Sequence, residues 1–291
     1  MIEVPISFEY LVNNQIEMKK ILTLTDFSAI ANHAIDAALV FAKKHNAELE
    51  IYHVLKSSDH IMYELDSGPE LFIRNRKNKI INTKLDGWKQ KANELGVKVN
   101  LIIGAVEIVQ GVLDIVNSQN IDLIIMGSTG MDESDSVWGS TTQQVVKKVD
   151  VPVLVIKSKM RDYKFDNLVF ASNLDLKDRE TLTRSLELVK PSSDAVIHLM
   201  SVNTSSFFSQ PRVLMTSVLK EFEKLVAPYK SESAFYRDYS VDAGIRHYME
   251  RVDPDMLIMS NRERHPLKKL FVPNAALTAV GEIDCPVLIL K

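Results

Sequence analysis

Several features are scarce or absent in this chain of 291 residues, and each absence excludes a class of protein. Cys285 is the single cysteine, so no disulfide can form within the chain, and a reducing cytoplasm is the expected location. The longest apolar runs are strand-sized, as in Val287–Leu290, and none approaches the ~18 residues of a membrane span. Residues 1–17 lack a signal-peptide pattern, and Met18 is an alternative start directly before an apolar run.

Strong charge of one sign is also missing. The chain has 35 Lys and Arg against 38 Asp and Glu, a formal net charge of −3, so no overall basic field would attract nucleic acid or an anionic membrane. The seven histidines show no metal-binding spacing. A Gly-x-Ser-x-Gly elbow and a Walker loop are absent from the sequence as well. We therefore expect no nucleic-acid or membrane partner, no metal site and no catalytic residues.

Two copies of one pattern follow each other along the chain. The segment Asp150–Lys157 (DVPVLVIK) recurs as Asp284–Lys291 (DCPVLILK), with five of the eight residues identical. Upstream, Ile121–Met126 (IDLIIM) matches Pro254–Met259 (PDMLIM). Such self-similarity indicates duplicated structural units. The sequence therefore predicts two tandem domains of one kind, each closed by its copy of the repeated segment.

Each copy is predicted to be an α/β domain with an open parallel, Rossmann-like sheet. In the first copy, strand-like apolar runs alternate with amphipathic helical segments. The strands are expected at residues 21–25, 49–55, 97–103, 123–126 and 153–156, and the helices at 29–45, 75–95, 109–118 and 141–149. Because the strands are almost continuously apolar, helices should cover both faces of the sheet. The predicted domains span residues 18–159 and 160–291.

The most informative stretch follows the predicted fourth strand. Gly127-Ser-Thr-Gly130 is separated by eight residues from Gly139, and Ser140 and Thr141 then open a helix. Glycines let a backbone approach a phosphate closely, and a helix N-terminus offers unpaired N–H groups with a favourable dipole. In an open parallel sheet, the ligand crevice lies at the carboxyl ends of the strands, where this loop starts. The pattern favours a phosphate-bearing ligand, with a tight turn and a helix N-cap as the alternative.

With these motifs the chain resembles the universal stress protein family in its tandem two-domain form, within the nucleotide-binding α-hydrolase superfamily. The resemblance covers residues 18–291. It rests on five segments: Lys20–Ser28 (KILTLTDFS), His53-Val54, Met126–Gly130 (MGSTG), Gly139-Ser140 and Val151–Ile156 (VPVLVI). The resemblance implies a stress-response protein whose first domain binds ATP as a regulatory ligand, with at most slow hydrolysis.

Carried over by position, the resemblance also implies a set of ligand-binding residues in the first domain. Thr25, Asp26 and Val54 would lie beside the adenine and ribose. Met126 and Gly127 would lie near the ribose. The residues implied around the phosphates are Gly130, Gly139, Ser140 and Thr141.

The first domain departs from the family pattern in two ways. Its spacer between the two glycine motifs is one residue shorter, and it carries Asp132, Glu133 and Asp135 where a phosphate site would gain from basic residues. A divalent cation such as Mg²⁺ between carboxylates and phosphates would reverse the repulsion. These departures keep a second hypothesis open, namely a scaffold that binds no nucleotide and acts through protein partners or another small ligand.

The second copy keeps the architecture without the glycine loop. Ser260 replaces the first glycine, Asn173 stands in the place of Asp26, and Pro273–Ala275 replaces the second glycine motif. Proline removes an N–H donor, so we expect no adenine nucleotide there. Because this copy folds without the loop, the glycines of the first copy point to a ligand rather than to the fold. A basic loop offers either a point-charge anion site or a solvated surface: Arg262, Arg264, His265, Lys268 and Lys269.

The closing strands of the two copies allow one further expectation. Single domains of the family resemble one another in dimerising through their last strands. Val153–Ile156 and Val287–Leu290 are therefore predicted to pair within one chain as a pseudo-dimer, which would cover an exposed edge of each sheet. Whether two chains also form a homodimer is left open by the sequence.

Overall fold

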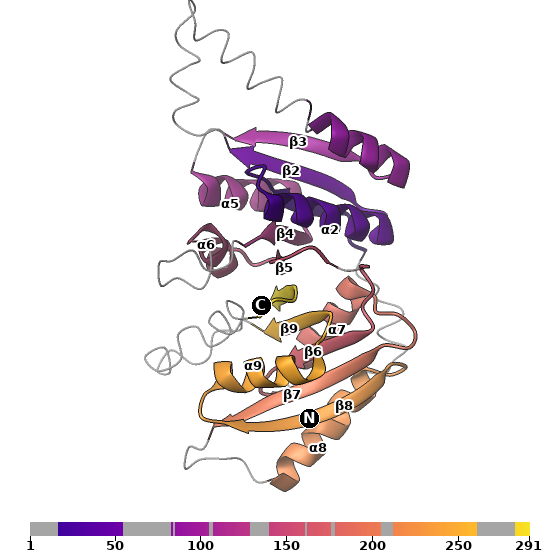
Figure 1. The fold of residues 1–291 in the computed structure, drawn as a ribbon, viewed down its shortest axis with the longest axis vertical. Helices are drawn as coiled ribbons and strands as arrows, with labels where there is room; N and C mark the ends of the chain where they lie inside the picture. The colour runs from indigo at the N-terminus through magenta and orange to yellow at the C-terminus, as the bar shows by residue number, and fades with distance from the viewer. Residues whose placement is uncertain are drawn as a thin grey trace, which may run out of the picture.

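A computed structural model describes residues 17–54, 83, 85–104, 107–128, 140–160, 162–175, 178–204, 212–260 and 283–291. Strands and helices alternate through most of these segments (Figure 1). The first half contains β1 (Lys20–Leu24), α2 (Ala29–His45), β2 (Glu48–Val54), β3 (Val99–Gly104), α5 (Ile108–Gln119), β4 (Leu123–Gly127), α6 (Ser140–Lys148) and β5 (Val153–Ile156). The second half contains β6 (Asn167–Ala171), α7 (Asp178–Val189), β7 (Val196–Thr204), α8 (Arg212–Leu225), β8 (Lys230–Asp238), α9 (Val241–Val252), β9 (Met256–Ser260) and β10 (Val287–Leu290).

The strands form one ten-stranded sheet in the order β3-β2-β1-β4-β5-β10-β9-β6-β7-β8. Each half has the same internal order, because β8-β7-β6-β9-β10 repeats β3-β2-β1-β4-β5. Figure 1 shows the strands stacked from β3 at one end of the molecule to β8 at the other. The predicted α/β class is confirmed. The predicted strands and helices of the first copy also match the described elements within one or two residues, except that only residues 83 and 85–95 of the helix expected at 75–95 are described as helical.

The two halves meet at their closing strands. All neighbouring strands run parallel except β5 and β10, which pair antiparallel with Leu288 opposite Leu154. Both leucine side chains are almost completely buried. The predicted pairing of the closing strands within one chain is therefore confirmed, and it turns two open sheets into one continuous mixed sheet.

Helices cover both faces of this sheet. On one face, a buried apolar cluster is lined by α2, α7 and α8, and on the other a second cluster is lined by α5, α6 and α9. Each cluster includes residues from both halves, so the apolar core is continuous across the β5–β10 joint. In the described part of the chain, no helix is both long and apolar enough to cross a membrane.

The end of α2 adds a polar contact between the halves. The Lys44 ammonium donates to the carbonyls of Val189 (2.8 Å) and Lys190 (2.5 Å), at the C-terminus of α7. The ring of His45 lies 2.8 Å from the carbonyl of Leu188, and since a carbonyl only accepts, Nε2 carries the proton. These are terminal carbonyls that a helix cannot satisfy internally. The first domain thus caps a helix of the second.

From this contact we predict that the free energy of unfolding depends on pH. Burial lowers the pKa of His45 from 6.5 to about 4. The hydrogen bond to Leu188 opposes this shift, and the charges of Lys190 and Lys44 reinforce it. As the pH falls from 6.5 to 4, His45 binds a proton in the unfolded chain but stays neutral in the folded chain. The free energy of unfolding therefore decreases in this window. Since His45 is only partly buried, we expect a loss of about 1–2 kcal/mol.

The measurement is urea unfolding at pH 7 and pH 5, for the natural chain and for His45→Gln, which keeps an N–H donor without titrating. The variant should lose less stability than the natural chain over this interval. An equal loss in both would show that His45 does not carry the effect.

Candidate functional site

The strand order reverses at β1 and β4, so a ligand crevice is expected at the carboxyl ends of these two strands. From β1 the chain moves outward to β2 and β3, then returns to add β4 on the opposite side of β1. In open α/β sheets, ligands bind where the strand order reverses in this way. The same reversal occurs between β6 and β9 in the second half. Each half therefore has one candidate site, at equivalent positions.

A tight turn joins β1 to α2 at this crevice. Thr25 is buried, and its hydroxyl accepts the N–H of Phe27 (3.0 Å). The exposed Asp26 accepts the N–H of Ser28 through Oδ1 (2.9 Å), and Ser28 caps α2 by accepting the N–H of Ala31 (3.2 Å). Both side chains thus stabilise the turn, Thr25 from a buried position and Asp26 from the surface at the strand end.

The rings of Phe27, His53 and Trp88 pack together at this turn. Phe27 has a left-handed backbone (φ 65°), its ring stacks on Trp88 at 5.7 Å, and it lies 4.6 Å from the ring of His53. His53 Nδ1 donates to the carbonyl of Thr25 (2.8 Å). Val54, which ends β2, follows directly after His53. The predicted residues Thr25, Asp26 and Val54 are therefore brought together at neighbouring strand ends, with an aromatic wall that the sequence did not indicate.

The end of β4 forms the other side of the crevice. Met126 is buried, and the Thr142 hydroxyl donates to the carbonyl of Gly127 (3.2 Å), which ties the first turn of α6 to the strand end. A Cβ on Gly127 would lie 2.7 Å from Cγ2 of Ile30 and 3.2 Å from its backbone. Close packing against Ile30 therefore favours glycine at this position, beside the role in ligand binding that the sequence suggested.

Helix α6 begins at Ser140, as the sequence predicted. Both Ser140 and Thr141 lie in the first turn of α6, where backbone N–H groups lack intrahelical acceptors, and Ser140 is exposed while Thr141 is partly buried. Thr142, which no sequence motif indicated, anchors this turn. Gly130, Gly139 and the acidic spacer lie outside the described residues, as do Pro273–Ala275 and the basic loop of the second copy.

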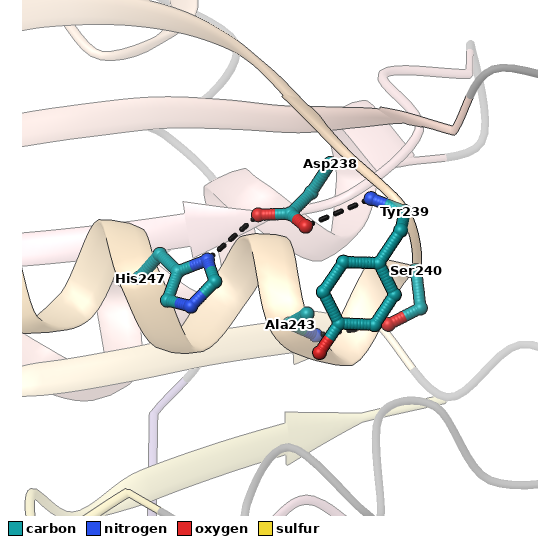
Figure 2. A network of polar contacts seen from close by, with 5 residues as sticks. All are labelled: Asp238, Tyr239, Ser240, Ala243 and His247. Atoms are coloured by element: carbon teal, nitrogen blue, oxygen red, sulfur yellow. Dashed lines mark hydrogen bonds and ion pairs between the residues drawn. The ribbon is translucent and has the colours of Figure 1, made fainter.

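Other polar clusters in the described residues have structural roles. At the end of β8, the Asp238 carboxylate accepts from Nδ1 of His247 (2.7 Å) and from the N–H of Tyr239 (2.8 Å) (Figure 2). Ser240 caps α9 by accepting the N–H of Ala243 (3.3 Å). The His247 hydrogen bond lowers the pKa of Asp238. Together these contacts fix the turn between β8 and α9.

The described residues contain neither a cluster arranged for a metal ion nor a thiol with a lowered pKa. Within the described segments, no group of three or more His, Cys, Asp or Glu side chains is arranged to hold a metal ion. Burial raises the pKa of the Cys285 thiol to about 12, so the sulfur stays protonated at neutral pH. A thiol in that state is a poor nucleophile.

Comparison with known proteins decides the family. The profile of the universal stress protein family matches residues 17–157 and again residues 164–291. The chain belongs to the universal stress protein family. It contains two universal stress protein domains in tandem, which confirms the resemblance noted from the sequence.

Individual relatives agree with this assignment. Universal stress protein MJ0577 of Methanocaldococcus jannaschii is 30% identical over 155 residues, which is 48% of this chain and 96% of that protein. Universal stress protein YxiE of Bacillus subtilis is 30% identical over 145 residues, covering 47% of this chain and 98% of its own length. Each of these relatives has the length of one domain of this chain.

A solved structure matches the whole architecture. The crystal structure of a universal stress protein from Archaeoglobus fulgidus superposes with a TM-score of 0.69, covering 94% of this chain and 97% of that one. Its sequence identity is 17%, so the likeness concerns the fold alone. The two-domain arrangement of this universal stress protein thus has a solved counterpart.

Proposed function

We propose that the first domain of this universal stress protein binds an adenine nucleotide, ATP, as a regulatory ligand. The observation that carries the proposal is the meeting of two strand ends with a helix N-terminus at the point where the strand order reverses. Asp26 comes from the end of β1, Gly127 from the end of β4, and Ser140 from the start of α6. Together they place a polar side chain at one strand end and a helix N-terminus, which favours negative charge, at the other.

The proposed binding residues follow from this arrangement. The adenine and ribose would lie at the ends of β1 and β2, and the phosphates at the start of α6, where the N–H groups and the helix dipole favour negative charge. Mg²⁺ would bridge the phosphates to the acidic spacer. The proposed contacts are Thr25, Asp26, Val54, Met126, Gly127, Gly130, Gly139, Ser140 and Thr141.

Calorimetric titration with ATP and Mg²⁺ tests this proposal, and the repeat supplies a matched control. Asp26→Ala removes a proposed ribose contact, and we expect it to weaken binding about tenfold, equivalent to about 1.4 kcal/mol. Asn173→Ala makes the equivalent change in the second domain and should leave the affinity as it is. Absence of binding at millimolar ATP, or equal effects of the two variants, would overturn the proposal and favour the scaffold hypothesis.

A further inference from the structure

A buried histidine of the second domain joins the sheet to α9. His198 on β7 is 5% exposed, and its Nδ1 lies 2.9 Å from the hydroxyl of Tyr248 on α9, which is 4% exposed. The two rings meet edge to face, with their centroids 5.9 Å apart. The same nitrogen lies 3.5 Å from Oε2 of Glu232, which is directly opposite on the edge strand β8 and has a largely exposed side chain. One ring nitrogen thus has two partners within reach, a hydroxyl from the helix and a carboxylate from the edge of the sheet.

The first domain has a different arrangement at the equivalent place. By strand register, Glu50 occupies the position of His198, and its buried carboxylate accepts from the amide of Asn100 on the edge strand β3 (3.0 Å). On the helix, Ile115 follows the N-cap of α5 by eight residues, as Tyr248 follows the N-cap of α9. The same architecture therefore forms at this place without an imidazole and without a hydroxyl from the helix.

Titratable and charged groups approach His198 from two elements. On β8 these are Glu232 and, farther along the same face, Tyr236, whose ring packs on that of Tyr248 at 5.8 Å. On α9 they are Tyr248 itself and Arg251, whose charge acts on the Tyr248 hydroxyl. The neighbouring residue on β6 is apolar. Burial lowers the pKa of His198 and the charge of Glu232 opposes this shift, so the ring is neutral at pH 7.

We propose that His198 is a proton-dependent switch whose Nδ1 exchanges its partner between α9 and the edge strand β8. In the neutral ring, Nδ1 accepts the hydroxyl proton of Tyr248. A protonated ring carries N–H groups on both nitrogens and cannot accept, so Nδ1 donates to the Glu232 carboxylate in a stronger, charge-assisted hydrogen bond. The Tyr248 hydroxyl then loses its acceptor in a position shielded from water, and α9 is held less firmly on the sheet. This inference does not depend on the proposed nucleotide site.

The exchange of partners is tested by NMR titration of the histidines in the full chain between pH 8 and pH 4, with the His198 signal assigned by its absence from His198→Gln. Tyr248→Phe removes the donor that favours the neutral ring, so the pKa of His198 should rise by about half a pH unit or more. Glu232→Gln removes the charge that favours the protonated ring, so this pKa should fall by a similar amount. Any other pair of directions, or a ring that stays neutral down to pH 4 in the natural chain, would overturn the proposal.

The loosening of α9 is tested by amide hydrogen exchange at pH 7 and pH 5. His45→Gln serves as the background, because it removes the pH effect at the end of α2. At pH 5 we expect the protection factors of the α9 amides to fall about threefold or more, while those of α5 in the first domain hold. Adding His198→Gln, or Tyr248→Phe, which lacks the hydrogen bond at both pH values, should abolish the fall. His247 on the same helix is present in every variant, so an equal fall in all of them would overturn the proposal.

Discussion

Replacing Leu288 with alanine is expected to lower the free energy of unfolding by about 2–5 kcal/mol. Leu288 is 1% exposed and lies opposite Leu154 at the antiparallel joint between β10 and β5. Truncation removes apolar contacts and leaves a cavity in a core that both domains share. Because the joint is the one antiparallel ladder among the described strands, the loss should weaken the coupling of the two domains as well as the local core.

Urea unfolding followed by circular dichroism measures this loss. Ile103→Ala is the control, since Ile103 lies on the edge strand β3 with 53% of its surface exposed, and it should change stability by less than about 0.5 kcal/mol. Combining Leu288→Ala with Leu154→Ala should give a non-additive effect because the two side chains face each other. If Leu288→Ala costs no more than the control, the closing strands do not pair as described.

Gly127→Ala is expected to destabilise the protein by about 1–3 kcal/mol and to weaken nucleotide binding. The added Cβ would lie 2.7 Å from Cγ2 of Ile30 and 3.2 Å from the Ile30 backbone, so α2 must move away from the end of β4. That movement would separate Asp26 from the start of α6. The effect on binding would therefore follow from the packing, without a direct contact to the ligand.

A matched glycine supplies the control for this prediction. Gly87 lies in the helix at residues 85–95, and apart from its own helix backbone nothing in the described structure lies within 4 Å of the position that a Cβ would take there. Gly87→Ala should therefore be neutral or stabilise by about 0.5–1 kcal/mol. In the variant Gly127→Ala, a second change of Ile30→Ala should recover part of the loss. Equal stability of Gly127→Ala and the natural chain would show that α2 is not packed as closely as the structure indicates.

Much of the fold was predictable because it depends on local pattern and on repetition. The helix expected at residues 29–45 is the observed α2, since its apolar spacing and the Ser28 cap are both local signals. The repeat of Asp150–Lys157 at Asp284–Lys291, together with the family resemblance, predicted the β5–β10 ladder. The strand ends and the start of α6 that frame the candidate site lie within one or two residues of their predicted places.

The remaining features depend on contacts between distant residues, which periodicity does not encode. Trp88 meets Phe27 across a long stretch of sequence, and Lys44 caps a helix in the other domain. The closeness of Gly127 to Ile30, which leaves no room for a Cβ at this position, is visible only when α2 is placed on β4.

Whether one domain alone binds nucleotide is tested most directly by native mass spectrometry of the intact chain after incubation with ATP and Mg²⁺. The first domain offers the proposed site, whereas the second has Ser260 and Pro273–Ala275 in the places of the glycine motifs. We expect a single mass increment of one nucleotide per chain, at a reduced fraction in Asp26→Ala and unchanged in Asn173→Ala. Two increments per chain, or none, would contradict a single site in the first domain.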